Sequence, residues 1–174
     1  YLRSGAMAAH SPIMREVVNA ANRGVRVLGI CNGFQVLIEA GLLPGALMRN
    51  IHLKFVCKHV HLRAEKPLNN ALHSYNAGDI IRVPVAHGDG NYYADDAILR
   101  QLEDENRIAF RYCDETGAMT DTANPNGSTA NIAGITNESG TILGMMPHPE
   151  NATQAWQASD NGRGLFAGLA NAIA

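Results

Sequence analysis

The spacing of apolar residues changes twice within the first quarter of the chain. Ser11 and Pro12 are followed by apolar side chains at helical spacing, which predicts a helix that ends at residues 22–24. Residues 25–30 are a short aliphatic run with β-branched side chains, typical of a strand buried on both faces. Residues 33–40 again have helical composition. This part of the chain is therefore expected to form a helix, a strand, a tight turn and a second helix.

The rest of the chain is rich in segments that alternate apolar and polar residues, as half-buried strands do. Strands are predicted over residues 54–63, 79–85, 107–112, 132–136 and 141–146. Two amphipathic segments, residues 95–103 and 163–173, are predicted helices. Helices that alternate with buried strands are typical of a doubly wound α/β fold, in which a mostly parallel sheet carries helices on both faces. In such folds ligands bind at the carboxyl ends of the strands.

Length and composition indicate a single globular domain over residues 1–174. The chain is 46% apolar and 17% charged with a net charge of −2, so it lacks the basic excess that binding to nucleic acid or an acidic membrane requires. Its longest apolar stretch, residues 25–43, is interrupted by polar side chains and is not expected to span a membrane. Cys31, Cys57 and Cys113 form no CxxC pair, which argues against a disulfide framework and favours a reducing cytoplasm.

The strongest local signal for chemistry is Gly29-Ile-Cys-Asn-Gly33, between the predicted buried strand and the second helix. A nucleophile between small residues at a strand-to-helix turn is typical of a nucleophile elbow, where the central residue adopts strained backbone geometry. Cys31 would then stand at a helix N-terminus, whose partial positive charge favours a thiolate. A free cysteine is more often a small buried apolar residue, so the motif needs a second feature to support it.

His148-Pro-Glu150 supplies that second feature, because a cysteine nucleophile needs a base and the base needs a group that orients it. The tripeptide follows the strand predicted over residues 141–146, so it lies at the carboxyl end of a strand, as Cys31 does. If the two strands are parallel, both motifs meet at the same rim of the sheet. An isolated His-Pro-Glu is more often an incidental surface loop, but in combination with the elbow it favours a catalytic site.

Gly29-Ile-Cys-Asn-Gly-Phe-Gln35 together with Met145-Met-Pro-His-Pro-Glu150 resembles the class I, or triad-type, glutamine amidotransferases, which have a flavodoxin-like fold. Further segments are similar to the glutaminase subunit of phosphoribosylformylglycinamidine synthase, an enzyme of purine biosynthesis. These segments are Leu42-Leu-Pro-Gly45, Met48-Arg-Asn50, Lys54-Phe-Val-Cys57, Pro84-Val-Ala-His-Gly-Asp-Gly90 and Asn124-Pro-Asn-Gly-Ser128. The similarity runs over nearly the whole chain.

The resemblance implies a role for each site residue. Cys31 is the implied nucleophile, His148 the general base and acid, and Glu150 the carboxylate that orients His148. Gln35 and Asn32 are implied in binding the substrate glutamine, Asn32 through a backbone amide of the oxyanion hole. Gln35 lies one helical turn after Cys31 and faces the same way, where its amide can donate and accept. From spacing alone, Gln35 fits equally well as a solvated helix residue.

The implied reaction hydrolyses glutamine to glutamate and ammonia through a Cys31 thioester, and the ammonia passes within a complex to a synthetase subunit. The resemblance places ATP and Mg²⁺ in this large synthetase subunit, adds a small accessory subunit as a further partner, and implies no cofactor in this chain. Gly88-Asp-Gly90 is too short for a phosphate-binding loop. Three other functions stay open: the glutaminase of another class I amidotransferase, a cysteine hydrolase of similar fold, and a catalytically silent interaction subunit.

The start of the chain departs from the family pattern. Family members begin with a strand, a helix and a strand before a Gly-Gly-Phe-Ser-Tyr-Gly-Asp loop, whereas this chain starts inside that loop at Tyr1. The resemblance therefore implies an N-terminally truncated domain. A glycine of that loop would supply one oxyanion-hole amide, and Asn32 the other.

Six histidines lie outside the two catalytic motifs, and four of them suggest a function. His59 and His61 share one face of a predicted strand, with His52 nearby, but no carboxylate pair completes a ligand set, so no metal site is predicted. His87 stands in a loop that resembles a family loop near the glutamine site and the partner. Such a position is compatible with His87 ordering that loop rather than performing chemistry, and the sequence leaves its role open.

Overall fold

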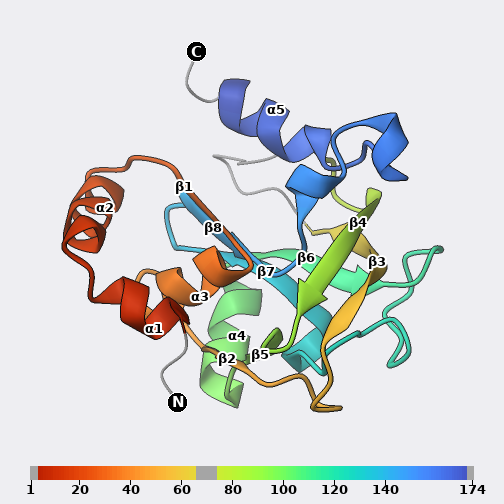
Figure 1. Cartoon of the computed structure of the whole chain (residues 1–174), viewed down its shortest axis with the longest axis horizontal. Helices are drawn as coiled ribbons and strands as arrows, with labels where there is room; N and C mark the ends of the chain where they lie inside the picture. Colours follow the sequence, from red (N-terminus) through yellow and green to blue (C-terminus); the bar gives the residue numbers. More distant parts are fainter. Residues whose placement is uncertain (1–3, 66–73, 172–174) are drawn as a thin grey trace.

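The computed structural model describes residues 4–65 and 74–171 and has a six-stranded sheet at its centre (Figure 1). The strands lie in the order β1 (Val27–Ile30), β8 (Ile142–Met145), β7 (Ile132–Thr136), β6 (Ile108–Cys113), β3 (Val56–Ala64) and β4 (Ile80–His87). A second, small sheet pairs β2 (Ala46–Met48) with β5 (Asn91–Tyr93). The helices are α1 (Ser4–Ala9), α2 (Pro12–Asn22), α3 (Asn32–Glu39), α4 (Asp96–Asp104) and α5 (Arg163–Asn171), with short 3₁₀ turns η1 (Thr129–Asn131), η2 (Pro149–Asn151) and η3 (Ala155–Gln157).

The sheet is mixed, which corrects the mostly parallel pairing expected from the sequence. Among the described strands only β1 and β8 pair in parallel, and the other four neighbouring pairs are antiparallel. The physical reason is connection length, because parallel neighbours need a crossover of a dozen or more residues whereas a short loop joins antiparallel ones. Residues 137–141 form such a short loop between β7 and β8.

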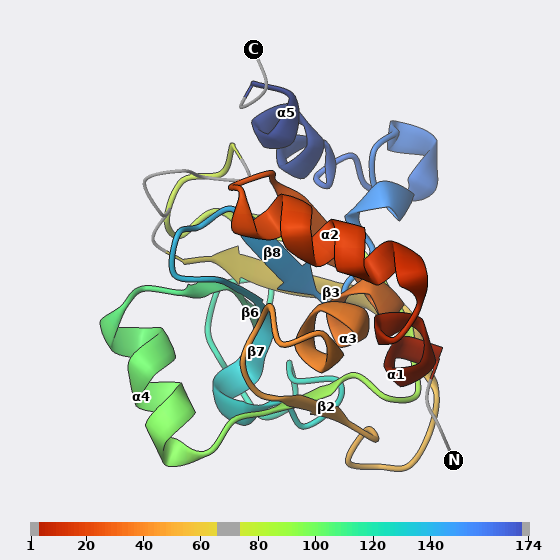
Figure 2. The ribbon, with the colours of Figure 1, turned by 90° about the vertical axis from the view of Figure 1, so that its left-hand side faces the viewer.

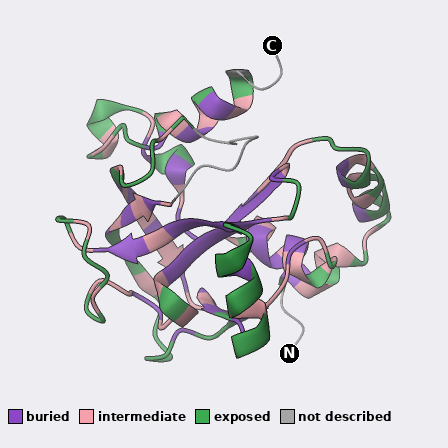
Figure 3. Ribbon diagram, turned by 180° about the vertical axis from the view of Figure 1, so that it is seen from behind, coloured by how far each residue is buried: buried purple, intermediate pink, exposed green. Residues whose placement is uncertain are grey.

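Each face of the sheet has its own hydrophobic cluster and its own helices. On one face α2, α3 and α4 contribute Ala21, Phe34 and Leu102 to a cluster with apolar residues of β7. On the other face α5 contributes Leu165 to a cluster built mainly from β3, β4 and β6. Figure 2 shows α1, α2 and α3 together on one side, and Figure 3 shows that the strands are largely buried. The α/β class with helices on both faces is therefore confirmed.

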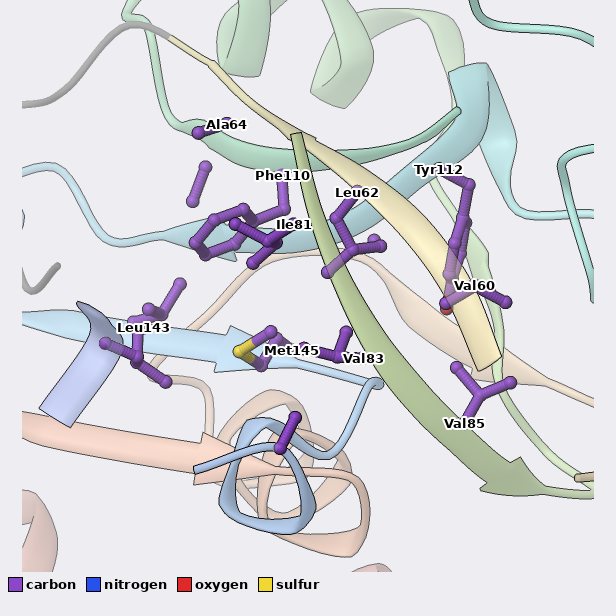
Figure 4. Packing of buried hydrophobic residues seen from close by; sticks show 14 residues of the cluster. Val60, Leu62, Ala64, Ile81, Val83, Val85, Phe110, Tyr112, Leu143 and Met145 are labelled. Atoms are coloured by element: carbon purple, nitrogen blue, oxygen red, sulfur yellow. The ribbon is translucent and has the colours of Figure 1, made fainter. Parts of the chain in front are cut away.

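The sheet curls so that its last strand, β4, approaches β8 although the two are not neighbours in the sheet. Val83 of β4 and Met145 of β8 are both fully buried in the cluster on the α5 side. Figure 4 shows their side chains next to each other, with Leu62 and Phe110 above them in the same view. The curl also brings the residues that follow β8 against β4, since His148 N donates a hydrogen bond to Pro84 O at 2.8 Å.

Local sequence explains where the helices begin. α2 starts with Pro12 directly after Ser11, whose backbone is extended, and proline is favoured at that position because it has no N–H to satisfy. α4 starts after Asp95, whose carboxylate accepts hydrogen bonds from the backbone amides of Ala97 and Ile98 at 3.1 and 2.8 Å. This is the N-cap that frees α4 from two unpaired amides.

Most elements predicted from apolar spacing are confirmed to within a few residues, namely α2, α3, α4, α5, β1, β3, β4, β6, β7 and β8. The structure adds α1, β2 and β5, which are too short to show a clear period. Residues 172 and 173 of the last predicted helix, and the loop expected at Tyr1, lie outside the described residues. No helix within residues 4–65 and 74–171 has the length and apolar character needed to cross a membrane.

Candidate active site

Cys31 is the residue at which the chain turns from β1 into α3. Its backbone has φ 52° and ψ −107°, a conformation that costs a non-glycine residue about 1–3 kcal/mol. A hydrogen bond from Cys31 N to Met145 O at 2.8 Å holds this turn beside the paired ends of β1 and β8. Because α3 begins at Asn32, the thiol stands at the N-terminus of a helix. The chain thus forms the strained strand-to-helix turn that the motif predicts.

Glycines on β1 and β8 let α3 pack directly against the strands. A Cβ atom on Gly29 would overlap the Leu37 side chain and lie 2.8 Å from the backbone carbonyl of Gly33. A Cβ atom on Gly144 would overlap the ring of Phe34. Gly33 differs, because no described atom lies within 4 Å of the position its Cβ would take. The first glycine of the motif is therefore required by packing, and the second is not.

His148 and Glu150 reach the same place from the end of β8. His148 Nδ1 lies 2.6 Å from Glu150 Oε1. The backbone amide of His148 donates a hydrogen bond to Pro84 O of β4. The Cys31 Sγ atom lies 3.9 Å from Ala86 O of the same strand. Since β1 and β8 are parallel, their carboxyl ends meet here. The structure brings together the three residues that the two motifs place at one rim.

The surroundings of His148 favour its charged form. Interaction with the Cys31 side chain, followed by the hydrogen bond to Glu150, raises the pKa of His148 to about 10 in spite of partial burial. Its Nε2 atom is buried and makes no hydrogen bond within the described part of the chain. Because Nδ1–H donates its hydrogen bond to Glu150 Oε1, Nε2 is the nitrogen left to exchange a proton with the thiol or with a substrate.

The two residues predicted to hold a substrate lie on either side of the first turn of α3. Gln35 is 6% exposed, and its Oε1 accepts a hydrogen bond from the backbone amide of Gly5 in α1 at 3.3 Å. Its Nε2 atom is buried and has no partner among the described residues. Asn32 is exposed at the first position of α3, where backbone amides have no acceptor within the helix. Both residues therefore have donor capacity in the first turn of the helix that follows Cys31.

Asn50 joins the loop after β2 to the loop after β4. Its side chain is fully buried and makes four hydrogen bonds. Nδ2 donates to Lys54 O at 2.8 Å and to His87 O at 2.9 Å. Oδ1 accepts from Gly90 N at 3.0 Å and lies 3.1 Å from His87 Nδ1. Every donor and acceptor of the amide is used, so the orientation of the amide is fixed.

His87 continues this network as a neutral ring. Burial is the main cause that lowers the pKa of His87 to about 4, with a smaller contribution from the charge of His148. Because Asn50 Oδ1 is an acceptor, His87 Nδ1 carries the proton and Nε2 is free to accept from Asn126 Nδ2 at 3.4 Å. Asn126 in turn donates to Gly90 O at 2.7 Å, and its Oδ1 accepts from Ser128 Oγ at 2.6 Å. The network orders the loop after β4.

Two cysteines and three histidines of the described residues are not part of this centre. Cys57 is exposed on β3, and Cys113 is buried on β6, where burial raises the pKa of its thiol to about 11. His52 and His59 are exposed and His61 is half-buried. Within residues 4–65 and 74–171, no three His, Cys, Asp or Glu side chains are grouped so that they could hold a metal ion.

Sequence reasoning missed four contributors to the centre: Gly5, Asn50, Ala86 and Asn126. Asn50 and Asn126 stand in segments that the family resemblance singles out, but no periodicity distinguishes a buried, fully bonded asparagine from one in a surface turn. Ala86 contributes only its carbonyl, which any residue has. Gly5 could be identified only from the packing of α1 on α3, where a Cβ at Gly5 would lie 2.5 Å from Gln35 Cγ.

Comparison with known proteins gives consistent matches over the described chain. The family model described as the CobB/CobQ-like glutamine amidotransferase domain matches residues 3–166. The chain is 55% identical over 170 residues to the phosphoribosylformylglycinamidine synthase subunit PurQ of Bradyrhizobium diazoefficiens, covering 98% of this chain and 73% of that protein. The PurQ subunit of Nitrobacter winogradskyi is 56% identical over 169 residues, covering 97% of this chain and 72% of that protein.

A solved structure agrees with these relatives. A chain in the structure of PurLQS from Thermotoga maritima matches with a TM-score of 0.82 at 39% identity, over 100% of this chain and 74% of that chain. The match holds for both sequence and fold, and the family model spans the elbow, the His148 loop and the network around Asn50. This chain therefore belongs to the glutamine amidotransferase family, in which its relatives are PurQ subunits of phosphoribosylformylglycinamidine synthase.

Proposed function

We propose that this chain hydrolyses glutamine to glutamate and ammonia, and supplies the ammonia to the synthetase subunit that makes formylglycinamidine ribonucleotide in purine biosynthesis. The observation that carries the proposal is the Cys31 thiol at a strained turn beside a His148 imidazole that Glu150 orients at 2.6 Å. The names of the PurQ relatives and of the PurLQS structure support the partner. The reaction takes place in the cytoplasm, with ATP and Mg²⁺ bound by the synthetase subunit.

In the first half of the reaction the Cys31 thiolate attacks the side-chain amide carbon of glutamine. The C–S bond forms as the carbonyl π electrons move to oxygen, and the resulting oxyanion is stabilised by backbone amides such as that of Asn32. When the tetrahedral intermediate collapses, the C–N bond breaks and His148 Nε2 donates its proton to the leaving nitrogen. The products of this half are ammonia and a glutamyl thioester on Cys31.

In the second half, neutral His148 takes a proton from water as the water oxygen attacks the thioester. The C–S bond breaks, the thiolate returns, and glutamate leaves with the new oxygen. Glu150 holds Nδ1 protonated through both halves, which keeps Nε2 directed at the reacting atoms. Glu150 acts on the imidazole alone and has no contact with the substrate in this mechanism.

Gln35 is the residue suited to recognise the polar end of a glutamine. Its Oε1 is occupied by Gly5 N, so the unpaired, buried Nε2 is available as a donor. An unpaired buried amide is costly, and a bound acceptor oxygen would relieve that cost. Selection against substrates without such an oxygen follows, because they would leave Nε2 unpaired.

The proposal is tested by comparing two nitrogen donors in the complex with the synthetase subunit. Glu150→Ala should lower glutamine-dependent synthesis by about 10³- to 10⁴-fold, since the imidazole loses its orientation, and leave synthesis from ammonium salts unchanged. Glu115→Ala, at an exposed carboxylate in a turn after β6, is the matched control and should change neither rate. Glutamine-dependent synthesis that persists in Glu150→Ala would refute the role of Glu150, and a parent complex that uses ammonium but not glutamine would favour a catalytically silent subunit. Loss of the ammonium reaction in Glu150→Ala would refute the division of labour.

A further inference from the structure

The loop between β2 and β3 exposes three large apolar side chains within five residues. Ile51 is 63% exposed, Leu53 76% and Phe55 68%. We call residues 51–55 the apolar loop. Water contact with three such side chains in so short a segment gives the fold no stability, and a contiguous exposed apolar patch is typical of an interaction surface.

The backbone of the apolar loop is held in place although its side chains are exposed. Ile51 N donates to Asn126 O at 3.0 Å, Leu53 N donates to Asn50 O at 2.8 Å, and Lys54 O accepts from the Asn50 side chain at 2.8 Å. Leu53 has φ 56°, in the left-handed region that a branched side chain rarely adopts. The loop is thus preorganised, and a preorganised surface loses less conformational entropy on binding.

The apolar loop lies beside an open recess and close to the catalytic centre. Phe55, Val56 and Cys57 line a recess of about 960 Å³ together with Asn124 and Pro125. The Phe55 ring lies 3.8 Å from the position that a Cβ on Gly88 would take, directly after His87. β4 therefore connects this surface to Pro84 and Ala86, whose carbonyls contact the His148 and Cys31 residues.

The charge around the apolar loop has one sign along the sequence. The segment between Glu39 and Glu65 has no acidic residue and includes Arg49, Lys54 and Lys58, although the chain as a whole has a net charge of −2. His52, Lys54 and Lys58 line the recess. Two carboxylates face the region from other loops: Asp121 lines the recess, and Asp89 lies 3.8 Å from Arg49. The surface therefore has an apolar centre with a mainly cationic rim.

We propose that the apolar loop is the docking surface for the synthetase subunit, which meets it with an apolar depression bordered by carboxylates. This assignment rests on the proposed function, because it takes the synthetase as the partner. Leu53 and Phe55 are the central anchors, and Lys54 and Lys58 pair with acidic residues at the rim. Docking here places the partner over the loops that Asn50 and His87 order, next to the site where ammonia is released.

The test measures the affinity of the synthetase subunit for a double variant, Leu53→Ser with Phe55→Ser, by titration calorimetry. We expect the Kd to rise at least about 10²-fold, because each anchor of this kind contributes about tenfold or more. Ile13→Ser on α2, where Ile13 is 66% exposed, is the matched control and should change the Kd less than about threefold. Lys54→Glu should weaken binding by about tenfold and reduce the dependence of the Kd on salt.

Two further measurements separate failure of the docking surface from failure of the proposed function. The Tm of the free double variant should equal that of the parent chain, since both side chains are already exposed. An electrophilic glutamine analogue should still label Cys31 in the double variant. An unchanged Kd with Cys31 labelled would overturn the docking surface and leave the proposed function standing. A parent chain that neither binds the synthetase subunit nor is labelled at Cys31 would overturn both.

Discussion

Two regions meet at the catalytic centre, and they are positioned by different forces. The elbow from β1 to α3 is held by close apolar contact, in which Gly29 and Gly144 bring Leu37 and Phe34 against the strands. The loops around Asn50 and His87 are held by hydrogen bonds between buried polar groups. The elbow requires glycines, which have no side chain, at two positions. The polar loops require every hydrogen-bond partner of Asn50 to be present.

The two regions tolerate different changes. Dispersion contacts do not titrate, so the elbow should be indifferent to pH and sensitive to added volume. The polar network uses all four bonds of Asn50 and a neutral His87, so it should be sensitive to protonation and to the loss of any single partner.

The largest effect is expected from Gly29→Ala in the elbow. The new methyl group would meet the Leu37 side chain and the Gly33 backbone, and backbone cannot move aside, so the free energy of unfolding should fall by about 3 kcal/mol or more. For a chain of this size the Tm should fall by about 6–12 °C in a thermal melt.

Gly33→Ala is the matched control for that change, since it lies in the same five-residue motif. No described atom lies near its added Cβ, and alanine is the better helix former, so the free energy of unfolding should stay the same or rise by up to about 1 kcal/mol. Equal losses in the two variants would show that close packing does not fix the elbow.

A smaller effect, and one that depends on pH, is expected from the polar network. Because the folded pKa of His87 is lowered to about 4, the unfolded chain binds more protons than the folded chain between pH 6.5 and 4. The contribution of a neutral His87 to stability is therefore complete above pH 6.5 and is lost as the pH falls towards 4. At pH 4.5 the loss from this group should be roughly 2–3 kcal/mol.

The measurement is urea unfolding of the parent chain and of His87→Gln at pH 7 and pH 4.5. A glutamine side chain at position 87 cannot take up a proton. Between pH 7 and pH 4.5 the variant should therefore lose roughly 2–3 kcal/mol less free energy of unfolding than the parent. Gly29→Ala should lose as much as the parent, since this variant keeps His87. If the parent and His87→Gln lose the same free energy of unfolding, the network does not depend on a neutral ring.

The smallest effect is expected from a change outside both regions, Asp95→Ala at the start of α4. It removes the acceptor of two backbone amides and should lower the free energy of unfolding by about 1 kcal/mol. Glutaminase turnover at 25 °C should not change, because the N-cap has no contact with the centre. A fall in turnover in Asp95→Ala would mean that any modest loss of stability disturbs the site. Effects of changes in the elbow and in the polar network could then not be assigned to their local contacts.

The elbow was predictable from the sequence, and the polar network was not. Small residues around Cys31 between a buried strand and a helix specify a local turn, so five consecutive residues contain the information. His148 and Glu150 are also local to each other, two residues apart. The hydrogen bonds of Asn50 reach to residues 87 and 90, so their existence depends on the curl of the sheet rather than on any short pattern. The directions of the strands were predicted wrongly for a related reason. The spacing of apolar residues indicates which side chains are buried, and it does not indicate whether neighbouring strands run parallel or antiparallel.

The carbonyls of β4 near the catalytic residues have a consequence for the fate of the unfolded and partly folded chain. β4 is an edge strand, and an edge with free hydrogen-bonding groups recruits strands from other molecules. Here Pro84 offers no N–H, its carbonyl is taken by His148 N, and Arg82 N donates to Asn161 Oδ1 at 3.0 Å. The His148 loop and Asn161 thus also shield this edge of the sheet from self-association. If this loop opens, His148 leaves the site proposed for catalysis and β4 becomes an edge that can pair with a strand of another molecule. Inactivation and the first step of aggregation then occur together.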